Sequence, residues 1–193
     1  MQELILVFLS SVLVNNFVLA RFLGICPFLG VSKSREQSLG MGCAMIFVTV
    51  SASFITYFIY HNLLLPLHLE FLQIIAFILV IAGFVQLVEM VMIKSFPSLY
   101  HSLGIYLPLI TTNCVIMAVV LLQVVEKYNL LQSLVFSAGA SVGFVLALIL
   151  MAGIRERLEF SALPQSLKGA PITLITAGLL SLAFMGFSGL VKM

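Results

Sequence analysis

The sequence predicts an all-α integral membrane protein with six transmembrane helices, arranged as two inverted halves. Of its 193 residues, 62% are hydrophobic and only 8% are charged, and the mean hydropathy is +1.24. Soluble domains carry about a quarter charged residues, so this chain could not cover a water-exposed surface. We expect helices because the sequence lacks the alternating strands of about ten residues that build a membrane barrel.

Six stretches are long enough to cross the hydrocarbon core, which takes about 20 apolar residues per helix. The third is the clearest, since residues 71–88 carry no charge. The first lacks the positively charged start of a secretory signal peptide, so we interpret it as a retained span. The expected spans are residues 3–23, 39–60, 71–93, 102–125, 130–153 and 170–190.

The distribution of Lys and Arg predicts that both termini lie on the outer, periplasmic side. Short cytoplasmic loops are enriched in these residues. With the termini outside, seven of the nine Lys and Arg residues fall inside, and Lys127 and Lys192 fall outside. The connection at 61–70 contains neither residue type, as expected of an outer loop. The inner set is Arg21, Lys33, Arg35, Lys94, Arg155, Arg157 and Lys168.

The first and fourth spans are expected to be interrupted at cysteine-containing breaks. Pro27 is expected to push Cys26 out of the helical conformation, because a residue before proline avoids it. Pro108 removes a helix hydrogen bond one or two turns before Cys114. The two stretches are GICPFLG at 24–30 and LPLITTNC at 107–114.

These breaks divide the chain into two halves of three spans, about 1–94 and 95–193. Because three is odd, the second half enters the membrane from the opposite side. Matching interrupted helices in inverted halves indicate a functional centre. The second and fifth spans are rich in small residues, which let helix backbones approach closely. Pairs of small residues four apart are Gly40/Ala44, Ser137/Ser141 and Gly139/Gly143.

Cys26 and Cys114 are the candidate ligand residues, because they occupy corresponding breaks in the two halves. Thiolates suit soft metals and iron–sulfur clusters, which normally take four protein ligands. The sequence has no Cys-x-x-Cys and no His at ligand spacing, so a metal site here requires two ligands from another chain. The alternative is that both cysteines are small residues buried in the core. Cys43 has no helix break beside it and is expected to pack.

Three charged features leave more than one interpretation open. Glu89, inside the third span, either belongs to an ion pathway or pairs near the inner surface with Lys94, Arg155 or Arg157. Arg21 either offsets the charge of a metal-bound thiolate group or extends to the inner surface as long cations do. The segment IRERLE at 154–159 is expected to be a charged inner connection, either the solvated end of a helix or a docking site for a soluble partner.

Known enzyme motifs are absent from the sequence: it has no phosphate-binding glycine loop, dinucleotide fingerprint or nucleophile elbow. We therefore expect no catalytic residue and no catalysis by this chain alone. The residues leave three classes of function open. These are a redox subunit that relays electrons, a secondary transporter without a redox cofactor whose broken helices line a substrate site, and a purely structural subunit. No basic run with interleaved aromatics suggests nucleic-acid binding.

Four segments closely resemble the A-type membrane subunits of the Rnf ion-translocating oxidoreductase complex. The related E-type subunits of the sodium-pumping NADH:quinone oxidoreductase are a more distant match, and NNFVL and CPFLGVSK favour the Rnf side. The resemblance runs over essentially the whole chain. The segments are VLVNNFVLARFLGICPFLGVSK, LGIYLPLITTNC, GIRERL and ITAGLLSLAFMGFSGLVKM.

The resemblance implies a multi-pass component of a bacterial inner-membrane complex that couples ferredoxin and NAD redox chemistry to ion movement. In some bacteria such a complex keeps a redox-sensing regulator reduced. The resemblance also implies pairing, in opposite orientation, with the paralogous E-type subunit of the Rnf complex. The two chains then share a 2Fe–2S cluster, with two cysteines from each. The family's cysteine positions fall on Cys26 and Cys114, and Cys43 has no such role.

Overall fold

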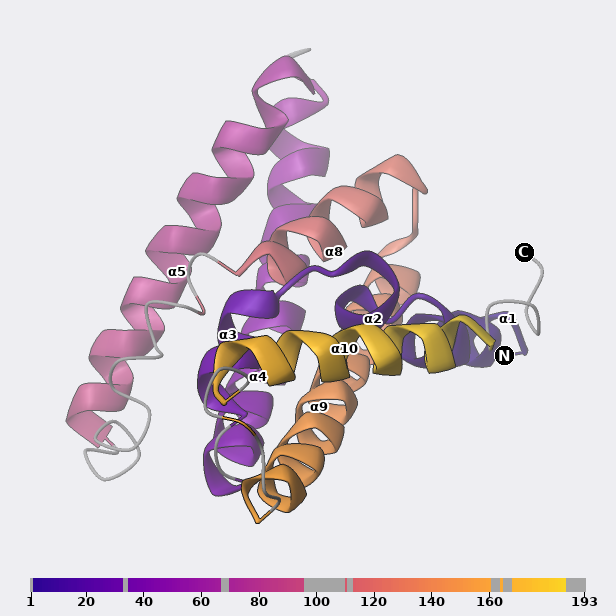
Figure 1. The fold of residues 1–193 in the computed structure, drawn as a ribbon. Coiled ribbons are helices and arrows are strands. Elements are labelled where there is room, and N and C mark those ends of the chain that lie inside the picture. The colour runs from indigo at the N-terminus through magenta and orange to yellow at the C-terminus, as the bar shows by residue number, and fades with distance from the viewer. Residues whose placement is uncertain are drawn as a thin grey trace.

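The computed structural model describes residues 2–32, 35–66, 70–95, 110, 113–160, 164 and 168–186, and this part of the chain is almost entirely helical, without strands. Figure 1 shows a bundle of long and short helices. Two single turns, η1 and η2, are π-helical, and η3 is a 3-10 turn. The elements are α1 (Gln2–Leu9), η1 (Ser10–Val14), α2 (Phe17–Arg21), α3 (Ile25–Val31), α4 (Arg35–Ile59), η2 (Tyr60–Leu64), η3 (Glu70–Leu72), α5 (Gln73–Ser95), α8 (Cys114–Val125), α9 (Leu130–Glu159) and α10 (Ala170–Met185).

Three of the described helices are long and apolar enough to cross a membrane, namely 37–64, 73–91 and 130–158. They coincide with the predicted second, third and fifth spans. Shorter apolar helices at 4–14, 114–125 and 170–185 fall within the other three spans. The first part of the fourth span lies outside the described residues. The helical character is therefore confirmed, and six complete spans stay a prediction.

The two central helices are α4 and α9, which form the largest helix–helix interface of the described chain. They are the second spans of the two predicted halves. Gly42 of α4 faces Val145 of α9 so closely that a Cβ at Gly42 would lie 2.8 Å from Val145 Cγ2. The core around this contact is fully buried: Met41, Met45, Val48, Ala52, Phe144, Ala147, Leu148 and Met151.

Small residues of α9 let the first helices approach it closely. A Cβ at Gly139 would overlap the Ser11 hydroxyl, and one at Gly143 would lie 3.0 Å from the Val12 carbonyl oxygen. The prediction for Gly139/Gly143 is thus confirmed, with η1 as the neighbour that these glycines admit. On α4 the close approach uses Gly42, which lies between the predicted Gly40 and Ala44.

Helices α5 and α10 flank the bundle (Figure 1). Helix α5 packs on α4 and α8 and leaves much of its apolar surface exposed. Helix α10 packs beside α2, where the Ser181 hydroxyl donates to the Leu19 carbonyl at 2.6 Å.

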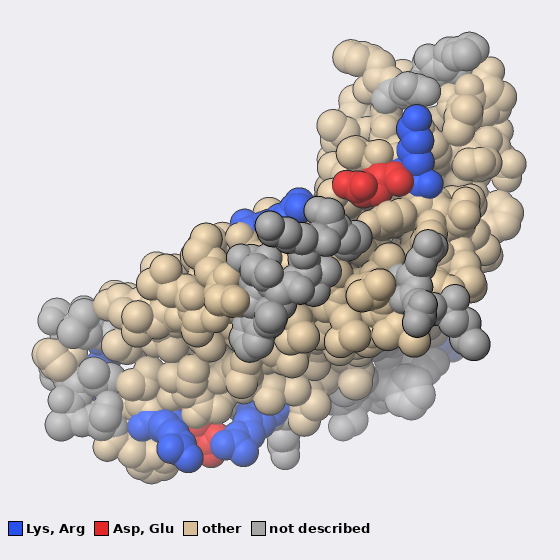
Figure 2. Space-filling view, turned by 90° about the vertical axis from the view of Figure 1, so that its right-hand side faces the viewer, with Lys and Arg blue, Asp and Glu red and all other residues tan. Residues whose placement is uncertain are grey.

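The face drawn in Figure 2 carries charged residues in only a few small groups. A surface of this kind suits lipid or another membrane chain and does not suit water.

The structure describes the ends of two predicted segments. Helix α9 continues to Glu159, so IRERLE at 154–159 forms the end of a long helix, as the first interpretation of this segment expects. The predicted first span is divided at residues 15–16 and again at 22–24, before GICPFLG begins its own helix. The physical reasons for these divisions lie in the side chains described next.

Candidate metal centre at the starts of two short helices

Asn16 makes the first division of the N-terminal span. It caps α2, with its Oδ1 accepting from the backbone N–H groups of Val18 at 3.2 Å and Leu19 at 3.4 Å. Its Nδ2 donates to the Gly143 carbonyl of α9 at 2.8 Å. The residue is only 1% exposed. An asparagine with both ends of its amide bound in this way fixes the start of α2 against the central helix.

The second division lies at Phe22 and Gly24, which both adopt left-handed backbone conformations, with φ of 55° and +79°. Gly24 is the N-cap of α3, and Cys26 and Pro27 lie in the first turn of that helix. The prediction that Pro27 forces Cys26 out of the helix is therefore wrong. Proline is tolerated in a first turn, because the N–H that it lacks would have no partner within the helix.

A third helix start carries the other candidate ligand. Cys114 is the first residue of α8, and Asn113 is its N-cap. The Oδ1 of Asn113 accepts from the Val115 N–H at 3.0 Å, while its Nδ2 contacts the Met45 sulfur of α4 at 3.3 Å. Asn113 is thus tied to α4 as Asn16 is tied to α9. Pro108, Thr111 and Thr112 lie outside the described residues.

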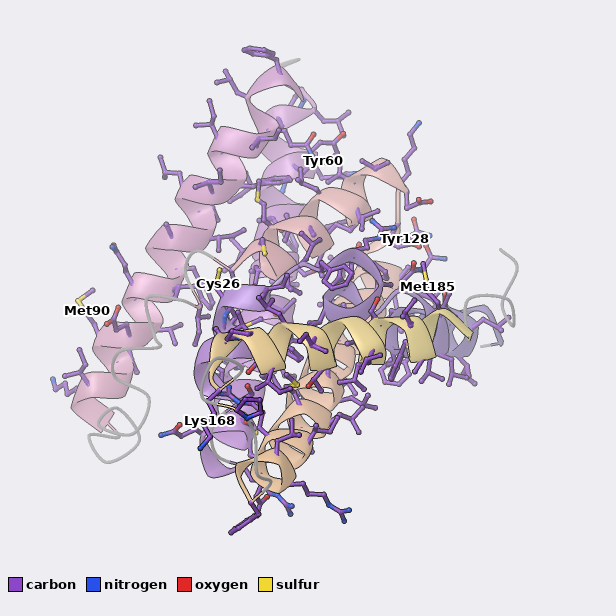
Figure 3. All side chains as sticks on the ribbon, in the orientation of Figure 1. Cys26, Tyr60, Met90, Tyr128, Lys168 and Met185 are labelled. Carbon is purple, nitrogen blue, oxygen red and sulfur yellow. The ribbon has the colours of Figure 1, made fainter. Side chains whose placement is uncertain are left out.

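The two cysteine-containing stretches meet directly. The backbone N–H of Gly24, two residues before Cys26, donates to the Cys114 Sγ at 2.8 Å. A Cβ at Gly24 would lie 2.6 Å from Val115 Cγ2 and 3.4 Å from Asn113 Oδ1. The start of α3 is therefore seated against the start of α8 at a position that only glycine fits. In Figure 3, Cys26 lies on α3 near the start of α8.

Arg155 holds the other end of α3. Its Nη1 donates to the Leu29 carbonyl at 2.9 Å and to the Ser32 hydroxyl at 2.8 Å. A cation at a helix C-terminus also offsets the negative end of the helix dipole. The predictions missed this role, because Leu29 and Arg155 are 126 residues apart and no local pattern links them. The ion pair of Arg35 with Glu156, at 2.6 Å, is exposed and contributes little.

The described part of the chain has two thiols that can bind a metal at the starts of α3 and α8. Cys26 and Cys114 are both exposed and free, so the alternative that they are buried in the core is wrong for these residues. Among the described residues, no group of three or more His, Cys, Asp or Glu side chains lies close enough to hold a metal ion. Two exposed thiols, one of which accepts a backbone N–H, fit half of a thiolate site whose sulfurs are hydrogen-bonded.

The remaining candidates lie elsewhere on the chain. Cys43 is exposed on α4, and the prediction that it packs inside is wrong, because Gly42 and not Cys43 turns toward α9. The Arg21 guanidinium is exposed and lies 5.7 Å from the centre of the Phe17 ring. Glu89 is half-buried on α5. Of the residues expected to pair with it, Arg155 binds α3 instead, and both interpretations of Glu89 stay open.

The comparisons with known proteins cover the whole chain. Residues 4–191 match the model of a family described as "Rnf-Nqr subunit, membrane protein". The A-type subunit of an ion-translocating oxidoreductase complex from Syntrophotalea carbinolica is 59% identical over 191 residues, 99% of each chain. The A-type subunit of a Na(+)-translocating ferredoxin:NAD(+) oxidoreductase complex from Acetobacterium woodii is 57% identical over 189 residues, 98% of each chain. An A-type subunit from Vibrio cholerae is 53% identical over 193 residues, 100% of each chain.

Proposed function

Because this chain belongs to the Rnf-Nqr family of membrane proteins, we propose that it is the A-type membrane subunit of a bacterial ion-translocating oxidoreductase complex. The complex would lie in the inner membrane and couple electron transfer between ferredoxin and NAD to ion movement. The names of these relatives and the near-complete coverage of both chains support this role. The apolar surface of the described helices agrees with a multi-pass membrane protein.

Within this complex, we propose that Cys26 and Cys114 supply two of the four thiolate ligands of a 2Fe–2S cluster. The paralogous E-type subunit of the Rnf complex would supply the other two. The observation that supports this site is the contact of Gly24 with the Cys114 sulfur, which joins the two motifs. Both thiols are exposed, as ligands shared with a second chain must be. When bound, such a cluster accepts and releases single electrons.

The chain's own residues have three tasks in this proposal. The Gly24 N–H stabilises negative charge on the Cys114 sulfur, because a charge-assisted hydrogen bond is stronger than a neutral one. Asn113 starts α8 at Cys114 and ties that start to α4. Arg155 holds the end of α3 and thereby orients the short helix that carries Cys26. Each contact restricts where a thiol can move, which is how a site keeps its geometry during electron transfer.

The test of this function is the metal content of the chain copurified with its membrane partner. A cluster shared by the two chains predicts about two iron and two acid-labile sulfide per pair. The full-length chain purified without the partner is expected to hold neither at that level, because it supplies only two ligands. Absence of iron and sulfide from an active, intact pair would contradict the proposal.

A secondary transporter is the second candidate, and the divided first span favours it. Discontinuous helices with polar side chains at the breaks line substrate sites in inverted-repeat transporters. Here the breaks lie at residues 15–16 and 22–24, with Asn16 buried at the first. This function predicts that vesicles containing the chain alone, without a partner and without iron, take up a solute. The proposed redox function predicts no such uptake.

A further inference from the structure

A pocket of about 380 Å³ opens where α4 and η2 end beside the turn between α8 and α9. Its lining is aromatic and polar. Tyr60 and Tyr128, which line it from η2 and from the turn, are labelled in Figure 3. Lys127, Asn129 and Gln123 also line it. At about 30 Å³ per molecule, a space of this size holds roughly a dozen waters.

The pocket continues into a buried cluster of hydrogen bonds. Gln123 is 2% exposed, although it lines the pocket, and it is bound to α4. The Ser53 hydroxyl donates to Gln123 Oε1 at 2.6 Å, and Gln123 Nε2 donates to the Thr56 hydroxyl at 3.2 Å. Ser53 and Thr56 are both fully buried. Polar groups thus extend from the pocket into the junction of α4, α8 and α9.

Ser133 of α9 lies at the inner edge of this cluster. Its backbone carbonyl accepts from the Ser53 hydroxyl at 3.5 Å, and its N–H donates to the carbonyl of Asn129, which lines the pocket. Ser133 is 2% exposed, yet among the described residues its Oγ has no hydrogen-bond partner.

The next serines along α9 differ from Ser133. The Ser137 hydroxyl donates to the Leu134 carbonyl at 2.9 Å, and the Ser141 hydroxyl donates to the Ser137 carbonyl at 2.9 Å. Both therefore satisfy their hydroxyls within their own helix. A buried hydroxyl without a partner is costly and usually indicates an ordered water or another small ligand.

We propose that an internal water molecule is bound at Ser133 Oγ, beside Ser53 and Gln123, and exchanges with solvent through the pocket. Hydroxyl, amide and carbonyl groups around one small site supply the two to four hydrogen bonds that a buried water needs. Among the described residues, no group of three or more His, Cys, Asp or Glu side chains could hold a metal ion, so a divalent cation is a poorer fit to this junction than water. The α4–α8–α9 junction is thus hydrated from one end. This inference does not depend on the thiol site.

The direct test is a map of the complex at a resolution that shows ordered waters. The proposal expects density within hydrogen-bond distance of Ser133 Oγ, next to Gln123. A Ser133 hydroxyl that instead donates to a protein carbonyl, with no density beside it, would overturn the proposal.

A stability test on the full-length chain with its membrane partner gives a second, independent readout. Ser133→Ala removes the hydroxyl, and Ser137→Ala is the matched control one turn along the same helix. If a water is bound, Ser133→Ala leaves its other partners less well satisfied and lowers the Tm below that of Ser137→Ala. If the site is dry, the substitution removes an unpaired buried hydroxyl, and an equal or higher Tm for Ser133→Ala overturns the proposal.

Discussion

The backbone N–H of Gly24 donates to the sulfur of Cys114 at 2.8 Å, joining the starts of two helices across 90 residues of sequence. This contact joins the start of GICPFLG to Cys114, the last residue of LPLITTNC. It needs a residue with positive φ and no side chain, because α8 fills the space where a Cβ would point. Stability is therefore expected to depend on this glycine, and so is the metal binding that we propose for the two cysteines.

Gly24→Ala is expected to destabilise the protein by about 2 kcal/mol or more. The left-handed conformation costs a non-glycine residue about 1–2 kcal/mol, and the added methyl must also displace Val115. Thermal unfolding of the full-length protein measures the effect. Gly178→Ala in α10 is the matched control, since a Cβ there meets no atom within 4 Å. That control should be neutral or slightly stabilising, and equal behaviour of the two variants would contradict the account.

Asn16→Ala is expected to cost about 2 kcal/mol, because it removes the cap of α2 and the side-chain hydrogen bond to the buried Gly143 carbonyl. The measurement is again the Tm of the full-length chain. Asn15→Ala serves as the control, since Asn15 is half-buried and lies outside α2. A loss that is no larger at Asn16 than at Asn15 would argue against the capping role.

Arg155→Ala is expected to release the end of α3. The loss of two hydrogen bonds from a charged donor costs about 1–3 kcal/mol. Freed at that end, α3 should hold the exposed Cys26 less firmly at the start of the helix, so alkylation of Cys26 by a maleimide should accelerate several-fold. Arg157→Ala removes an exposed arginine of the same helix and is the control. Identical alkylation rates in the two variants would exclude Arg155 as a positioning residue.

Tyr128, in the turn between α8 and α9, is expected to make the folded protein less stable at alkaline pH. Burial, and secondarily the charge of Glu126, raise the pKa of Tyr128 above its usual 10.0. The folded chain then holds the phenol proton more tightly than the unfolded chain. The protonated Tyr128 therefore contributes to the free energy of unfolding. This contribution is complete below about pH 10 and is lost as the pH rises through the raised pKa. The Tm of Tyr128→Phe should fall less than that of the parent above about pH 10, and parallel curves would contradict this.

The sequence predicted the long helices well, because α4, α5 and α9 are built from uninterrupted apolar runs. It missed the interruption at Asn16 and attributed the one beside GICPFLG to the wrong residue. Pro27 was predicted to interrupt the helix, but a proline in the first turn of α3 does not interrupt it. The interruptions come from the capping Asn16 and from the left-handed backbone at Phe22 and Gly24, and φ cannot be read from residue types alone.

The candidate ligands were predicted from the correspondence of the two halves and from the family resemblance. The residues around them were not. Arg155 and Asn16 act through carbonyls on helices more than 120 residues away, at Leu29 and Gly143. Such contacts arise from packing, and no local pattern of one sequence encodes them. The unpaired hydroxyl of Ser133 is of the same kind, since three helices together create its surroundings.

The central claim is that Cys26 and Cys114 are ligands of one cluster shared with a partner chain. The most direct measurement is the iron and acid-labile sulfide content of the copurified pair in Cys26→Ser, Cys114→Ser and Cys43→Ser variants. Cys43 is the matched control, because it is also an exposed cysteine but lies on α4, apart from the helix starts. The account predicts that the first two variants lose the cluster's iron, sulfide and visible absorbance while Cys43→Ser keeps all three. Unchanged iron and sulfide in Cys26→Ser or Cys114→Ser would contradict it.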